Sequence, residues 1–152
     1  MYRSAPRLAI KSVITILFSG ALSIFLPSCQ PGSKDAKGFR DFQAFYEKFH
    51  QDSVFQLNHI NFPLEGIPDN AGNYEGDLNS FRWEKESWQV HRPIDFEKSG
   101  YKQELNTFSD NMVVERIVHE SGDYAMMRRF ARLGDEWYLI YYAGLNSLNK
   151  AQ

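Results

Sequence analysis

Three polar side chains in the C-terminal third of the chain could together bind a ligand: Glu115, Arg128 and Tyr141. Apolar and polar residues alternate around each of them, so each belongs to a predicted β-strand. A carboxylate, a guanidinium and a phenol on one half-buried sheet face could hold an anionic or polar ligand, because arginine offers planar donors and keeps its charge. His119 and Tyr124 fall near the end of the same row and complete the candidate pocket.

The row exists only if the hairpins turn where the glycines indicate. A two-residue turn at 134–135 places Arg128 opposite Tyr141, and a turn at 121–122 places Glu115 opposite Arg128. A slip of one residue would move all of these side chains to the other face of the sheet. The alternative interpretation is an ordinary cross-strand ion pair on a partly solvated sheet.

The same residues could also serve an isomerase. Such enzymes use a carboxylate base in an apolar pocket together with a phenol or acid that stabilises an oxyanion, roles open to Glu115 and Tyr141. Arg128 beside Glu115 would make the carboxylate a weaker base, which favours binding over catalysis. We therefore predict no catalytic residue, and we expect Arg128→Met to weaken ligand binding with little effect on folding.

Other chemistries lack the residues that they need. The four histidines show neither an HExxH motif nor the i, i+4 spacing of a zinc site. No serine lies in a GxSxG elbow, and no glycine-rich phosphate loop is present. We therefore predict no metal and no cofactor. Trp83 and Trp88 could stack on a sugar or a peptide, although burial in the core is the commoner role of such residues.

The residues from 39 to 52 predict an amphipathic helix. Its aromatic side chains fall within an arc of about 120° at helical spacing, opposite the charged ones; they are Phe39, Phe42, Phe45, Tyr46 and Phe49. We interpret this aromatic stripe as core. His50 ends the helix, where a positive charge would suit the helix dipole. Asp52 is the predicted N-cap of a short second helix at 53–58.

After residue 60 the pattern becomes extended and irregular. A brief extended segment and a long loop rich in Pro, Gly and Asn precede one expected short strand at 88–92. Longer strands are predicted at 101–108, 111–120, 124–133 and 136–144, with turn residues between them. Helices followed by an antiparallel meander indicate the α+β class, with the helices packed on the sheet.

The first 28 residues have the pattern of a secretory signal. A basic start without acidic residues precedes an apolar run of about 14 residues, which is too short to span a membrane comfortably. The run ends in the sequence LPSC, which resembles a bacterial lipobox with the chain's single cysteine, Cys29, at the lipid-attachment position. We predict a signal peptide at 1–28, lipidated Cys29 and a tether over 29–37, and one domain at 38–149. The alternative is an uncleaved anchor helix with an incidental cysteine.

Removal of this signal leaves a net charge of −5, because it holds three of the 17 basic residues and none of the 19 acidic ones. Nucleic acid is therefore not expected as a partner, since its recognition requires a positive face. Acylated Cys29 would bind membrane lipid. We expect the protein in the cell envelope, anchored to a bacterial membrane, the outer one being favoured, on its periplasmic or surface side.

A motif follows the first predicted helix and consists of Asp52, Phe55-Gln56, Ile60 and Phe62-Pro63-Leu64-x-Gly66. With the aromatic helix and the WYLIYY segment at 137–142, it resembles a family of uncharacterised Bacteroidetes lipoproteins over the mature chain. That family is similar to the nuclear-transport-factor-2-like superfamily, in which helices lie on a curved antiparallel sheet that forms a cone. The superfamily includes isomerases, dehydratases and binding modules, so the resemblance implies a fold and a location but no reaction.

These observations favour a module that binds a small molecule or an envelope protein. One alternative is a small non-metal enzyme of isomerase or dehydratase type that uses the cone cavity. Another is a structural interaction domain of an envelope complex. Whether the domain forms a homodimer is left open.

Overall fold

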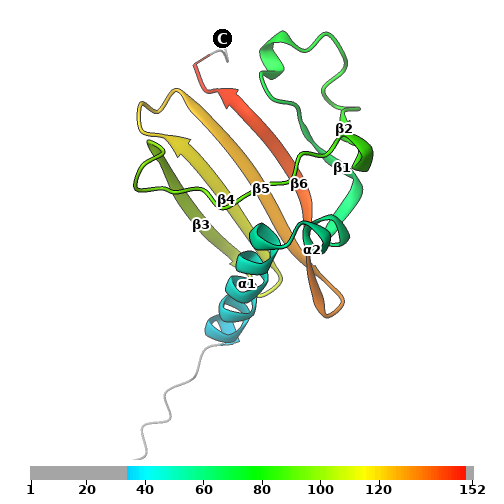
Figure 1. Ribbon diagram of the computed structural model, residues 1–152, viewed down its shortest axis with the longest axis vertical. Helices are drawn as coiled ribbons and strands as arrows, with labels where there is room; N and C mark the ends of the chain where they lie inside the picture. Colours follow the sequence, from blue (N-terminus) through cyan, green and yellow to red (C-terminus); the bar gives the residue numbers. More distant parts are fainter. Residues whose placement is uncertain (1–33, 150–152) are drawn as a thin grey trace, which may run out of the picture. The chain divides into compact units, whose positions relative to one another are not determined.

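The computed structural model describes residues 34–149, which form two helices followed by a six-stranded sheet (Figure 1). The helices are α1 (Lys34–Gln51) and α2 (Ser53–Asn58). The strands are β1 (Ile60–Ile67), β2 (Arg82–Trp83), β3 (Tyr101–Ser109), β4 (Met112–His119), β5 (Tyr124–Leu133) and β6 (Glu136–Ser147). Two short 3₁₀ turns, η1 (Ala71–Asn73) and η2 (Lys85–Ser87), lie in the loops. The predicted signal peptide and Cys29 lie outside the described residues.

The aromatic stripe of α1 packs against the sheet, as the helical spacing predicts. Phe42 and Phe49 are fully buried. The ring centroid of Phe42 lies 5.4 Å from that of Phe130 on β5 and 5.1 Å from that of Trp137 on β6. Edge-to-face contacts of this kind add to the free energy of burial. They hold α1 firmly across the middle of the sheet.

The break between the two helices is made by Asp52. Its Oδ1 accepts hydrogen bonds from the backbone N–H groups of Val54 and Phe55, at 3.0 and 2.9 Å. These are N–H groups that the first turn of a helix cannot satisfy internally, so the carboxylate caps α2. The predicted cap is confirmed.

The sheet has the order β2-β1-β6-β5-β4-β3 and is mixed rather than wholly antiparallel. The predicted meander from β3 to β6 is confirmed, because each of these strands is joined to the next by a hairpin. β1, however, runs parallel to β6. These two neighbours lie far apart in the sequence, so no hairpin dictates their relative direction.

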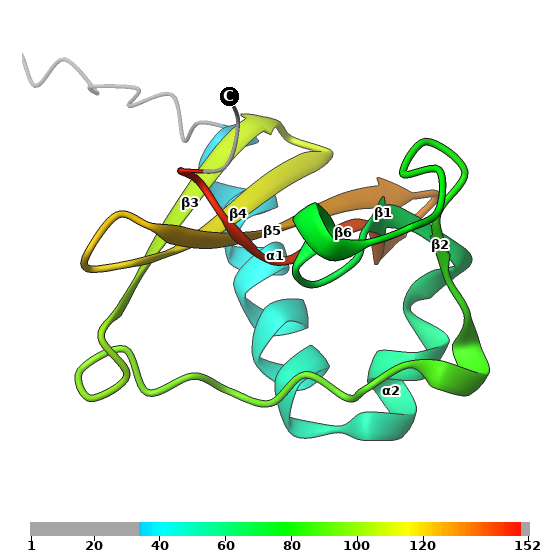
Figure 2. The same ribbon diagram turned by 90° about the horizontal axis from the view of Figure 1, so that it is seen from above.

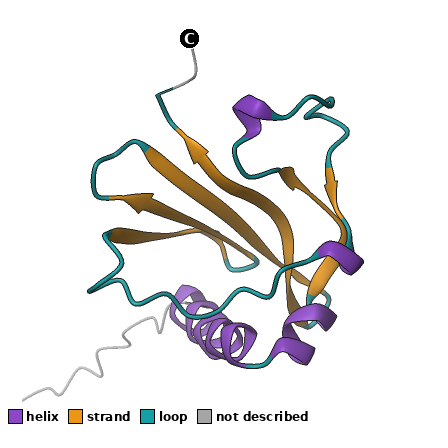
Figure 3. Cartoon of the chain, turned by 45° about the horizontal axis from the view of Figure 1, so that its top comes forward, coloured by secondary structure: helices purple, strands orange, loops and turns teal. Residues whose placement is uncertain are grey.

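The expected strand at 88–92 is wrong, because this segment has no strand pairing. The strand of this region is the two-residue β2, which pairs with β1 at the sheet edge. From there the chain between β2 and β3 runs past both helices as a long loop (Figure 3). Helices α1 and α2 and this loop lie on one side of the sheet (Figure 2).

A β-bulge in β6 shifts the register within the candidate site. Phe130 pairs with Leu139, as predicted, but Arg129 pairs with Tyr141, so Ile140 is an extra residue on β6. Arg128 consequently pairs with Tyr142, and the predicted pair of Arg128 with Tyr141 is wrong. A single extra residue has this effect because neighbouring side chains on a strand point to opposite faces.

Candidate functional site

A buried ion pair stands at the centre of the helix-covered face. Glu115 on β4 lies opposite Arg128 on β5, in the predicted register. Arg128 Nε approaches Glu115 Oε2 to 2.8 Å, and the side chains are 2% and 0% exposed respectively. The distance is that of an ion pair, although the two atoms do not align as a hydrogen bond. Ionised groups buried this deeply require several polar partners to offset the loss of water.

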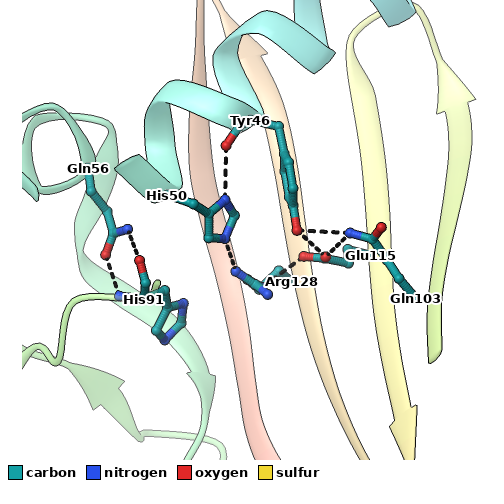
Figure 4. A network of polar contacts seen from close by, with 7 residues as sticks. All are labelled: Tyr46, His50, Gln56, His91, Gln103, Glu115 and Arg128. Atoms are coloured by element: carbon teal, nitrogen blue, oxygen red, sulfur yellow. Dashed lines mark hydrogen bonds and ion pairs between the residues drawn. The ribbon is translucent and has the colours of Figure 1, made fainter. Parts of the chain in front are cut away.

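Helix α1 and the edge strand β3 supply those partners to Glu115 (Figure 4). The hydroxyl of Tyr46 donates to Glu115 Oε1 at 2.5 Å, and the amide of Gln103 donates to the same oxygen at 2.6 Å. Gln103 also donates to the Tyr46 hydroxyl at 2.9 Å. Burial, with a further contribution from Glu115, raises the pKa of Tyr46, so this phenol stays protonated. The carboxylate of Glu115 is thus contacted by neutral donors as well as by Arg128.

His50 contacts the other side of Arg128 and is neutral. Its Nδ1 donates to the backbone carbonyl of Tyr46 at 2.9 Å, and its Nε2 accepts from Arg128 Nη1. This assignment follows because a carbonyl can only accept and a guanidinium can only donate. Burial and the nearby Arg128 lower the pKa of His50 to about 4. The expectation that His50 carries a charge suited to the helix dipole is therefore wrong.

A cavity of about 360 Å³ opens beside this network, between the sheet and the loop that follows β2. Arg128, Met126 and Tyr142 belong to its sheet side, Trp83 to the edge strand β2, and Trp88 and His91 to its loop side. Two exposed residues of opposite charge, Asp69 and Arg92, also line it. Glu115 does not line this cavity, which leaves the carboxylate without the access that a general base requires.

Gln56 of α2 holds the loop wall of the cavity in place. This side chain is fully buried, and its amide nitrogen donates to the carbonyls of Phe49 and His91 at 2.7 and 2.8 Å. Its amide oxygen accepts from the His91 backbone N–H at 2.8 Å and from the Trp88 indole at 3.2 Å. Both donors of the amide are used and its oxygen accepts twice, so Gln56 fixes this irregular segment in place. Figure 4 shows the two hydrogen bonds with the His91 backbone.

Three residues of the predicted row lie apart from the cavity. Tyr141 is on the opposite sheet face, where Arg129 stacks over its ring at 4.5 Å. His119 packs edge-on against Tyr101 at 5.0 Å, and its Nδ1 lies 2.9 Å from the Ser121 hydroxyl. Tyr124 is 45% exposed. Of the five predicted pocket residues, only Arg128 lines the cavity, with Glu115 directly behind it.

Sequence reasoning missed Tyr142, His91 and Gln56. Tyr142 takes the place expected for Tyr141 in the row, because of the bulge at Ile140. Gln56 belongs to the motif that precedes β1, but nothing in that motif indicates a contact with His91, 35 residues further along the chain. The two tryptophans of the segment from 83 to 88 were the sequence feature that indicated an aromatic wall of the cavity.

Two general features concern the residues from 34 to 149. Neither of their helices is long and apolar enough to cross a membrane. No three histidine or acidic side chains among them gather closely enough to hold a metal ion.

Comparisons with known proteins identify a fold but no family. No family model matches the chain, and no curated protein matches it. A cystatin-like protein from Bacteroides caccae is 23% identical, with 68% of this chain and 74% of that protein covered, at a TM-score of 0.51. The fold is cystatin-like. An NTF2-like protein from Bacteroides fragilis is 16% identical, with 71% and 46% covered, at a TM-score of 0.49.

The cystatin-like neighbour agrees with the predicted α+β class, in which helices cover a sheet. At such low identity the likeness concerns the fold alone and assigns no ligand or reaction. The candidate site must therefore be argued from its own geometry.

Proposed function

We propose that the protein is a binding module that takes a small ligand into the cavity beside Arg128. The observation that carries this proposal is an arginine that is 2% exposed and yet lines a cavity of about 360 Å³. Ligand sites are commonly concave and mainly apolar, with a few polar groups that fix the ligand's orientation. Here Arg128 is that group, and the surrounding aromatic rings supply the apolar walls.

A second hollow supports this choice by contrast. It has about 440 Å³ and lies on the opposite sheet face, lined by Met127, Ala143 and Arg116 among others. Its arginine is half-exposed and already paired with Glu104 at 3.2 Å. The hollow is therefore a mainly apolar surface with no buried charge aimed at a ligand, whereas the cavity beside Arg128 has one.

We further propose that Cys29 carries a lipid that anchors this module in a bacterial cell envelope. The proposal rests on the sequence pattern of the first 29 residues. Cys29→Ser should abolish lipid labelling of the chain in cells fed a radiolabelled fatty acid, because no other thiol is available to accept it. Labelling that persists in the variant would contradict the anchor.

The three tryptophans allow a direct test of the binding proposal. Trp83 and Trp88 line the cavity, with their indole N–H groups bonded to Tyr142 and Gln56, whereas Trp137 lies elsewhere in the core. The full chain in detergent micelles would be screened by NMR against a library of aromatic acids, amides, alcohols and sugars. Binding in the cavity should shift the indole signals of Trp83 and Trp88 and leave that of Trp137 unchanged. The proposal fails if no compound shifts either signal.

A further inference from the structure

We infer that the ligand is a small monocarboxylate with a flat apolar body, held by the guanidinium of Arg128 and the hydroxyl of Tyr142. This inference rests on the binding function proposed above and specifies its ligand. It depends on three observations: the unused donors on the cavity floor, the charge around them and the rings that form the walls.

The first donor is Nη2 of Arg128. Nε of this guanidinium faces Glu115 and Nη1 contacts His50, so the network engages two of its three nitrogens. Nη2 forms no hydrogen bond with any residue from 34 to 149. It is also not one of the fully buried side-chain atoms that lack a partner, so it is not fully buried. Since the side chain lines the cavity, we place Nη2 at its surface. A guanidinium cannot lose its proton, so it requires an acceptor there.

The second donor is the hydroxyl of Tyr142. This residue lies directly opposite Arg128 on the neighbouring strand, is 7% exposed and lines the same cavity. Within the described part of the chain its hydroxyl has no hydrogen-bond partner. Burial raises the pKa of Tyr142 to about 12, with a further contribution from Asp69, so the phenol remains a donor at neutral pH. Two donors from paired residues on adjacent strands could serve the two oxygens of a carboxylate.

The charge around the cavity disfavours a second negative charge on the ligand. Glu115 already offsets the positive charge of Arg128. The exposed side chains of Asp69 and Arg92 carry opposite charges that offset each other. His91 is neutral, because burial lowers its pKa to about 3, as does the charge of Arg128. A dianion would add uncompensated negative charge near Glu115, which is unfavourable where water is excluded.

The walls favour a flat apolar body. The ring centroids of Trp83 and Tyr142 are 5.1 Å apart, those of Trp88 and Tyr142 are 5.6 Å apart, and His91 lies 4.6 Å from both Trp88 and Tyr142. Met126 and Ile94 are among the other residues that line the cavity. Aromatic ligands gain from contact with ring faces and edges in addition to burial of their area. An aromatic or similarly planar acid therefore fits these walls best.

The test uses benzoate, benzamide and phenylphosphonate as probes of the full chain in detergent micelles. Titrations would be followed by the indole signals of Trp83 and Trp88. Benzoate should bind about tenfold more tightly than neutral benzamide, since hydrogen bonds to a charged acceptor are the stronger ones. Phenylphosphonate, studied at a pH where it is a dianion, should bind more weakly than benzoate.

A matched pair of variants tests the role of the second donor. Tyr142→Phe removes only the hydroxyl in the cavity and should weaken benzoate binding about tenfold. Tyr141→Phe removes the same group on the opposite face and should leave the affinity unchanged. Equal effects of the two variants would overturn the assignment of Tyr142.

The ligand class and the binding function can fail separately. If benzamide or phenylphosphonate binds as tightly as benzoate, or if only library compounds of another class shift Trp83 and Trp88, the monocarboxylate is wrong and the binding function stands. If no compound of any class shifts these signals, both are wrong.

Discussion

The ion pair of Glu115 and Arg128 is buried, and this burial changes what a substitution there would do. Had the pair been exposed, its loss would cost about 0–1 kcal/mol of stability. With the two side chains 0% and 2% exposed, removal of the arginine leaves a carboxylate in the core without its counter-ion. The expectation that Arg128→Met leaves folding nearly intact therefore does not hold.

We predict that Arg128→Met lowers the free energy of unfolding by about 3–5 kcal/mol, as measured by urea denaturation. The double variant Glu115→Gln, Arg128→Met removes both charges and should recover part of that loss. The neighbouring Arg129→Met, on the opposite face, should have a small effect and serves as the control. A loss below about 1 kcal/mol in Arg128→Met would contradict the buried pair.

Buried neutral histidines make the stability depend on pH. The pKa values of His50 and His91 are lowered from 6.5 to about 4 and about 3 in the folded protein, mainly by burial and next by Arg128. The unfolded chain therefore binds more protons below pH 6.5. Stability should be intact above pH 6.5 and fall as the pH drops toward 4, by on the order of 3 kcal/mol from His50.

This dependence can be measured by urea unfolding between pH 7.5 and 5, a range in which most carboxylates stay ionised. His50→Gln keeps a donor and an acceptor but cannot be protonated, so it should reduce the slope. His119→Gln, at a partly exposed site, serves as the control. A slope unchanged by His50→Gln would mean that His50 does not titrate as described.

At the scale of elements, one side chain of α2 positions a loop that has no regular structure of its own. Gln56 forms four hydrogen bonds, three of them with Trp88 and His91 on the cavity wall. Gln56→Leu would leave these groups without their partner, and we predict a loss of about 2–4 kcal/mol in stability. Hydrogen exchange at the His91 amide should become faster, because its acceptor is gone.

Gln51→Leu provides the matched control, since Gln51 is exposed at the end of α1. If Gln56→Leu costs no more than this control and His91 exchange is unchanged, the loop is held by other contacts.

Local patterns predicted the elements well but could not predict the bulge. The aromatic spacing of α1, the cap at Asp52 and the turns of the last two hairpins are local, and each was confirmed. An extra residue such as Ile140 has no clear sequence signature, because it depends on how neighbouring strands twist and pack. The bulge places Tyr142 rather than Tyr141 opposite Arg128, so the site still combines a guanidinium and a phenol, as predicted.

At the scale of the whole molecule, the cavity is formed by segments that lie far apart in the sequence. Arg128 and Tyr142 come from the meander, Trp83 comes from the edge strand β2, and Trp88 and His91 come from the loop after β2. Such a site depends on tertiary packing, so periodicity and turn residues could locate its floor but not its walls. In this site we expect Arg128 to bind the acid group of a ligand within the cavity.

The most direct test is a crystal structure of the protein soaked with 4-bromobenzoate, with anomalous data collected at the bromine absorption edge. The bromine signal locates the ligand independently of the protein density. We predict one bromine peak within the cavity beside Trp83 and Trp88, with the carboxylate within hydrogen-bonding distance of Arg128 Nη2 and the Tyr142 hydroxyl. Bromine on the opposite face beside Met127, or an empty cavity in intact crystals, would contradict the account.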